Sequence, residues 1–145
     1  MSILRQDIVD AMKTRFLTIA TTGGYHNTLS GKVHIYYGKT TLSGTLVDIT
    51  DGDETYEQKA GGAVWDRRMT VTIAIKTDTS TSDTVARQLV ADIHKSIGTD
   101  VTWGGKAIDT TPVSSSIEVE HEESRIAGAT VTVEVLYRTG AWAES

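Results

Sequence analysis

The sequence contains no cysteine, one proline and one phenylalanine among its 145 residues. The absence of cysteine excludes a disulfide scaffold and thiolate chemistry, and it leaves histidine and carboxylate side chains as the available metal ligands. No apolar run approaches the roughly 20 residues that span a bilayer. Charged residues interrupt every apolar stretch near the N-terminus, so we expect neither a signal peptide nor a membrane anchor.

Positive charge is also scarce. Fourteen Lys and Arg residues against 19 Asp and Glu residues give a formal net charge of -5. A mildly acidic chain lacks the basic surface that supplies most nonspecific affinity for nucleic acids. The hydrophobic share of 39% and the charged share of 23% are ordinary for a globular protein. We expect a single domain spanning residues 1–145, with a short C-terminal tail at 140–145.

The clearest strand signal lies in residues 129–139, where apolar and polar side chains alternate, and the expected strand begins at Ile126. Alternate side chains point to opposite faces of a strand, so one face is expected to be buried and the other wettable. A second stretch, residues 64–76, alternates in the same way. The predicted buried faces comprise Met69, Val71, Ile73 and Ile75 in the earlier strand, and Val131, Val133, Val135 and Tyr137 in the later one.

Two helices are predicted from apolar residues at helical spacing. The first spans residues 2–19, with Ser2 as its N-cap and residues 21–24 as its stop. The second spans residues 82–98 and ends at a glycine. Its expected apolar stripe consists of Val85, Leu89, Val90, Ile93 and Ile97.

Turn residues divide the rest of the chain, and together the elements predict an α+β fold. We expect a mainly antiparallel sheet of four to five strands with two helices packed on one face. The remaining expected elements are strands at 33–37 and near 42–49, a turn at Asp51-Gly52-Asp53, a long hairpin including 55–59, a loop at 99–114 that contains Pro112, and a strand at 117–123 joined tightly near Ser124 to the last strand.

No motif indicates catalysis. The four histidines are scattered and never take a paired metal-binding spacing, and neither a phosphate-binding glycine loop nor a Gly-x-Ser-x-Gly elbow occurs. The acidic segment 48–57 offers oxygen ligands for a hard cation, but an EF-hand loop would need glutamate where Lys59 or Gly62 stands. We predict a solvated hairpin tip there, with no catalytic residue, cofactor or metal.

Two tryptophan positions suggest contacts with a partner. Trp65-Asp66-Arg67-Arg68 places arginines beside a tryptophan, the residue types enriched at protein interfaces. The same tetrapeptide also suits an ordinary strand start whose Trp65 covers the edge of the core, and both interpretations stay open. Trp142 lies in the tail with few neighbours to bury it. The predicted partner interface consists of Asp51, Asp53, Glu54, Glu57, Trp65, Arg67, Arg68, Arg138 and Trp142.

The order of elements and the last third of the chain resemble the phage tail terminator family, the minor tail proteins related to the lambda-type terminator. The resemblance rests on the helices at Ile3–Ile19 and Val85–Ile97, on Trp103-Gly104-Gly105-Lys106-Ala107, and on Val131–Thr139 with its Tyr-Arg-Thr ending. It extends over nearly the whole chain in layout, matches in detail only from Val85 onward, and is weak over residues 39–62.

The resemblance implies a structural protein at the head-proximal end of the virion tail, assembled in the host cytoplasm. Its expected form is a homo-hexameric ring that caps the tail tube, ends tube polymerisation and joins the neck or head-completion protein. The tail tube protein is the expected partner, with the sheath protein in contractile tails, and DNA would pass through without sequence-specific binding. We further hypothesise that Asp51–Glu57 faces the lumen or the tube.

Three other interpretations remain. One is a head-completion or neck protein of the same virion. Another, from a different class, is a small metal-dependent or hydrolytic enzyme, favoured only by the acidic segment and the histidines. The third is a monomeric binding module.

Overall fold

The computed structural model describes residues 3–36, 44–78, 82–119 and 126–145. These residues form two α-helices, five strands in one sheet, and short 3-10 turns at Thr21–Gly23 and Ala60–Gly62. The predicted α+β class is confirmed. In chain order the main elements are α1 (Leu4–Leu17), β1 (Val33–Ile35), β2 (Thr45–Lys59), β3 (Val64–Asp78), α2 (Ser82–Thr99), β4 (Asp109–Val119) and β5 (Ile126–Gly140).

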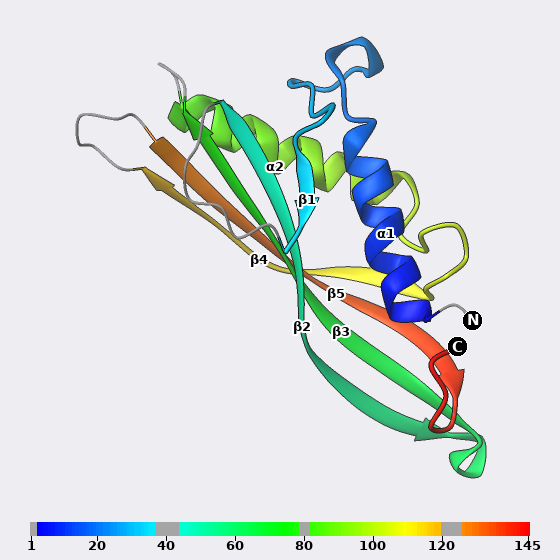
Figure 1. Cartoon of the computed structure of the whole chain (residues 1–145). Coiled ribbons are helices and arrows are strands. Elements are labelled where there is room, and N and C mark those ends of the chain that lie inside the picture. Colours follow the sequence, from blue (N-terminus) through cyan, green and yellow to red (C-terminus); the bar gives the residue numbers. More distant parts are fainter. Residues whose placement is uncertain (1–2, 37–43, 79–81, 120–125) are drawn as a thin grey trace.

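The strands are ordered β1-β2-β3-β5-β4. Every neighbouring pair is antiparallel except β1 with β2, so the sheet is mixed but mainly antiparallel. The central strands β3 and β5 pair along their full length, from Val64 opposite Gly140 to Asp78 opposite Ile126. Figure 1 shows the helices beside one half of this sheet, while the β2–β3 hairpin and the end of β5 extend beyond them.

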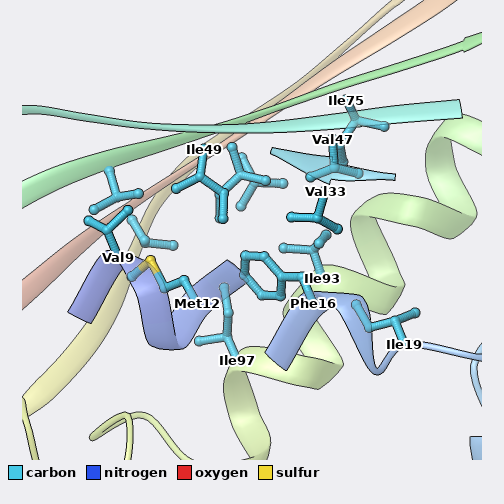
Figure 2. Packing of buried hydrophobic residues seen from close by; sticks show 14 of the residues in the cluster. Val9, Met12, Phe16, Ile19, Val33, Val47, Ile49, Ile75, Ile93 and Ile97 are labelled. Atoms are coloured by element: carbon cyan, nitrogen blue, oxygen red, sulfur yellow. The ribbon is translucent and has the colours of Figure 1, made fainter. Parts of the chain in front are cut away.

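Both helices pack on the same face of the sheet. Their buried residues join one cluster with alternate residues of β2, β3 and β5, which confirms the predicted buried faces. Figure 2 shows Met12 and Phe16 of α1 close to Ile93 and Ile97 of α2, with Ile49 on the sheet side. Burying side chains of this size contributes about 1.5–3 kcal/mol each, so this cluster is the main stabilising element.

The predicted turn at Asp51-Gly52-Asp53 is wrong, because β2 continues through it as a bulged strand. Asp51 pairs with Val71 and Glu54 pairs with Met69, so two residues of β2 stand opposite Thr70 alone. The extra residue reverses which side chains face the helices. Residues 47, 49 and 51 lie on the helix-side face of the sheet before the bulge, and residues 54, 56 and 58 lie on that face after it. The hairpin instead turns at Ala60–Gly62, where Ala60, Gly61 and Gly62 all have positive φ.

The predicted loop at 99–114 is too long, because β4 begins at Asp109. Pro112 lies inside this strand, immediately before a second register shift between Pro112 and Ser114. Proline has no N–H to donate, and it is tolerated here because β4 is the last strand of the sheet and is bulged at this point. The strand ends at Val119, and the predicted junction near Ser124 lies outside the described residues.

The helix ends also differ from the prediction. Ile3 is the N-cap of α1 and makes no side-chain cap, while the proposed cap, Ser2, lies outside the described residues. The first helical N–H, that of Leu4, donates to the backbone oxygen of Glu144 at 2.8 Å. The C-terminal tail therefore satisfies a group that a capping side chain usually satisfies, and the two ends of the chain meet (Figure 1). At its other end α1 stops at Leu17, before the predicted stop.

A buried acid interrupts the predicted stripe of α2. Asp92 is 1% exposed, and its carboxylate accepts the backbone N–H groups of His26 at 2.9 Å and Asn27 at 3.0 Å. Val85 and Val90 are only half-buried, while Ala86 lies in the core. Asp92 thus fastens the loop after α1, a long-range role that helical periodicity cannot reveal.

The Trp103-Gly104-Gly105 turn between α2 and β4 is anchored on both sides. All three residues have positive φ, and the Trp103 ring is buried with its Nε1 donating to Thr110 Oγ1 at 2.8 Å. The Arg15 guanidinium lies 4.1 Å from the centre of that ring. Asp100 closes the turn, since its carboxylate accepts the N–H groups of Thr102 at 2.9 Å and Gly104 at 2.8 Å.

Asp100 should make the stability of this fold depend on pH in acid. The Thr102 hydroxyl, followed by the Gly104 and Thr102 N–H groups, lowers the pKa of Asp100 from 3.8 to about 2. Its stabilising effect is therefore complete above the unfolded pKa and is lost as the pH falls from 3.8 toward 2. Asp100→Asn should reduce the fall of the urea midpoint over this range, measured by circular dichroism. Equal pH slopes in the two proteins would contradict the assignment.

Candidate assembly surface

The part of the sheet beyond the helices forms an arm, made of Glu54–Lys59 of β2, Val64–Met69 of β3 and Val135–Gly140 of β5. The arm has no helix to cover it (Figure 1), and the C-terminal tail at 141–145 lies against it. Ala141 donates its N–H to Ala63 at 3.0 Å, next to the hairpin turn. The base of the arm joins the main core through Met69, Val135 and Tyr137, and its outer part must be held by other contacts.

Buried charged residues hold the strands of the arm together on its helix-side face. The Glu54 side chain is 3% exposed and lies 3.4 Å from Arg5 Nη1 and 3.5 Å from Arg67 Nη1. The Tyr137 hydroxyl donates to the other carboxylate oxygen. Burial, and then this hydrogen bond to Glu54, raises the pKa of Tyr137, so the phenol remains a donor. Two cations and a phenol therefore balance one buried carboxylate.

Arg67 connects the arm to the tail. It is 4% exposed, and its Nε donates to Thr139 Oγ1 at 3.0 Å. Its Nη2 donates to the backbone oxygen of Ala143. The guanidinium also lies 5.3 Å from the Tyr56 ring centre and 5.5 Å from that of Trp65, within the range of cation–π attraction. One arginine thus links β2, β3, β5 and the tail.

Arg5 connects the arm to α1. Its Nε pairs with Asp51 at 2.6 Å, and its Nη2 donates to the backbone oxygen of Gly52 at 2.6 Å. Both partners lie at the bulge of β2. Since Arg5 also contacts Glu54, one helix side chain holds the bulge and the buried carboxylate together.

An aromatic hollow opens where the arm meets the tail. Tyr56, Trp65 and Trp142 contact one another in sequence, with ring centres 5.5 Å and 4.5 Å apart. Together with Gln58, Arg67 and Glu144 they line a hollow of about 490 Å³. Trp65 is buried, but Tyr56 is 56% and Trp142 is 87% exposed. Trp142 also has a φ of 58°, a backbone conformation that is strained for a bulky residue.

The opposite face of the arm carries ion pairs at the surface. Asp66 forms a two-bond pair with Arg138 at 2.6 Å and 3.2 Å, and the hydrogen bond from Arg138 lowers the pKa of Asp66. Arg68 pairs with Glu134 at 3.0 Å. These cross-strand pairs follow the register of β3 and β5. Asp66 is buried, whereas the side chains of Arg138 and Arg68 are about half exposed, so solvent screens both pairs.

The residues predicted as a partner interface all lie on the arm, at its base or on the tail beside it. The structure brings Glu54, Trp65 and Arg67 together on the helix side, and it places Glu57, Arg68 and Arg138 on the other face. Because Glu54 and Arg67 are buried within the chain, a partner would contact the surface that they support. The acidic segment is not the hairpin tip, since Asp51 and Glu54 are bound to arginines. The interface itself stays a prediction.

Sequence reasoning missed Arg5 and assigned Tyr137 only to the core. The available signal was weak: Arg5 is a charge in the first turn of an apolar helix, and Tyr137 ends a row of three valines with a side chain that carries a polar group. Neither signal identifies Glu54 as the partner, because Glu54 faces the helix side only after the bulge has shifted the register.

Two edges of the sheet lack a pairing strand among the described residues. β4 is the last strand on one side, and its Val113 and Ile117 are 59% and 39% exposed. On the other side β1 pairs only with Val47–Ile49, which leaves the arm portion of β2 at the edge. Unpaired edges are natural joining surfaces between chains.

Other kinds of site receive no support within the described part of the chain. There, no three His, Asp or Glu residues come close enough to hold a metal ion. Neither of the described helices is both long and apolar enough to cross a membrane.

Comparisons with known proteins identify a similar fold and no family. No family model matches the chain, and no curated protein matches it. Among solved structures it is similar to a chain in the virion of a native gene transfer agent particle, with a TM-score of 0.52 and 10% sequence identity. The match covers 90% of this chain and 93% of that chain. At this identity the likeness shows a shared fold.

The buried Glu54 cluster generates a test of how the arm is held. Glu54→Ala removes the buried counter-ion of Arg67 and leaves only the exposed Glu144 at 3.8 Å, so we expect a loss of about 3–5 kcal/mol in the free energy of unfolding. Glu57→Ala, on the same strand, removes only an exposed pair with Lys59 and should cost at most about 1 kcal/mol. Urea denaturation measures both. Equal losses in the two variants would mean that the cluster does not hold the arm.

Proposed function

We propose that this chain is a structural virion protein that acts as a tail terminator. In this role identical subunits form a ring, most simply a hexamer, that caps the phage tail tube and ends its polymerisation. The observation that carries the proposal is the likeness to a virion chain, because it extends over nearly all of both chains. The resemblance of Val85–Ile97, Trp103–Ala107 and Val131–Thr139 to the terminator family supports the finer role.

The surface of the molecule supports assembly rather than catalysis. The arm displays exposed aromatic rings, and two sheet edges lack a strand among the described residues. These features suit heterologous contacts, in which one surface of a subunit meets a different surface of the next. The proposed partners are further copies of this chain, the tail tube protein, the neck or head-completion protein, and the sheath protein in contractile tails. The role requires no enzyme activity.

The charge of the ring suits the passage of DNA. Six copies of a chain with a net charge of -5 carry about -30. An acidic bore repels the DNA backbone and lets the duplex slide without sequence-specific binding. Within the acidic segment, Asp53 and Glu57 are exposed and are the carboxylates that we assign to the lumen or the tube.

Negative-stain images of the purified protein test the proposal. We expect six-fold rings about as wide as a tail tube, and native mass spectrometry should give the mass of six 15.7 kDa chains. If rings form only on the tube, mixing with tube protein should limit tube growth. A chain that stays monomeric and leaves tube length unchanged would overturn the terminator role.

Removing the gene from the parent phage separates this role from that of a neck protein. Loss of a terminator should give tubes of uncontrolled length, because nothing stops subunit addition. Loss of a head-completion or neck protein should instead give tails of normal length that fail to join heads. Electron micrographs of the lysate distinguish the two outcomes.

A further inference from the structure

The two unpaired edges belong to opposite edges of the sheet. In the described residues β4 ends the sheet on one side, and the arm portion of β2 ends it on the other (Figure 1). A contact between these two edges on different copies would be head-to-tail, which is the kind of contact that closes into a ring. The details of the two edges decide whether they fit.

The β4 edge is unusually open to pairing. From Thr110 to Ile117 it carries no charged residue, although natural edge strands are commonly guarded by charges. Pro112 and the bulge after it guard only the first half of the strand. At that bulge Val113 is 59% exposed, so a proline and a valine stand together on an outer edge.

The arm edge presents a matching hollow. Tyr56 and Gln58 of β2 line it together with Trp65 and Trp142, and Trp142 is held on strained backbone with 87% of its surface exposed. Grooves lined by aromatic rings bind proline-containing extended segments, because the flat rings pack against the pyrrolidine ring. A strand carrying Pro112 and Val113 has this chemistry.

Charge favours the neutral edge as the occupant of the hollow. Glu144 lines the hollow and its side chain is 58% exposed, so two hollows facing each other would bring their carboxylates together. The uncharged stretch from Thr110 to Ile117 brings no like charge to this site. The uncharged edge of β4 is therefore a better partner for the hollow than a second arm would be.

We propose that Pro112 and Val113 of one copy dock in the aromatic hollow of the next, with β4 running beside the outer edge of the β2 arm. This contact rests on the proposed ring and supplies its subunit interface. Trp142 is its central anchor, which gives its strained backbone a role in binding.

The absence of cysteine allows a direct test by disulfide cross-linking. Val113→Cys and Gln58→Cys place one thiol on each proposed surface, and both positions are exposed. When the two purified single variants are mixed and oxidised, the mixed dimer should form in preference to either homodimer. A double variant should give a ladder of linked oligomers. Val113→Cys mixed with Thr84→Cys, an exposed position on α2, is the control and should remain unlinked.

Trp142→Ala provides a second measurement on the same contact. Since Trp142 is 87% exposed, its removal should leave the circular dichroism spectrum and the urea midpoint nearly unchanged. Loss of a central anchor worth about 2 kcal/mol would weaken association, and hence the yield of mixed dimer at limiting concentration, by roughly 30-fold. An unchanged yield would overturn the role of the hollow.

The remaining outcomes separate this contact from the proposed function. Rings in micrographs without the mixed dimer would overturn the contact and leave the terminator role standing. A mixed dimer with open chains in place of rings would support the contact and count against ring closure. A predominant Val113→Cys homodimer would show that two β4 edges pair with each other, and it would overturn the head-to-tail arrangement. A chain that stays unlinked and monomeric at high concentration would overturn it too.

Discussion

The pairing of β3 with β5 along all of Val64–Asp78 is the constraint on which the rest of the structure depends. The two helices cover only one half of this long ribbon, so the other half has no apolar layer against it. A two-sided sheet without such a layer is marginal in water. The chain meets the constraint with a buried ion pair, since Glu54 and Arg67, joined by the neutral hydroxyl of Tyr137, occupy the face that valines occupy further along.

Buried ion pairs rarely add much stability over a well-packed apolar cluster, but they are demanding about geometry. Each charge in the arm needs its partner in place, and those partners come from α1, from three strands and from the tail. The C-terminal tail accepts hydrogen bonds from Leu4 and Arg67, so the end of the chain fixes the start of the first helix and the arm together. The charge cluster thus specifies one position for the arm relative to the helices.

The periodicity of apolar residues was sufficient to predict the helices and strands that bury one face. Alternation identified β3 and β5, and the helical stripes identified α1 and α2, because burial against one core leaves a regular pattern. The arrangement of side chains on the arm could not be predicted, for a physical reason. Gly52 and its flanking aspartates suit a bulge as well as a turn, and one extra residue inverts the assignment of every side chain that follows. Without that register, Glu54 cannot be placed on the same face as Arg67, nor Tyr56 beside Trp65.

The same reasoning explains why the candidate surface lies where it does. Polar and aromatic residues that depart from alternation are costly on an ordinary sheet face, and here they gather on the arm, which extends beyond both helices (Figure 1). Trp142 adds a strained backbone and an almost fully exposed ring that rests on Trp65. Folding of the single chain gains little from that arrangement, because most of the ring still meets water. A second surface that covers the ring would gain the burial that the isolated chain leaves unused.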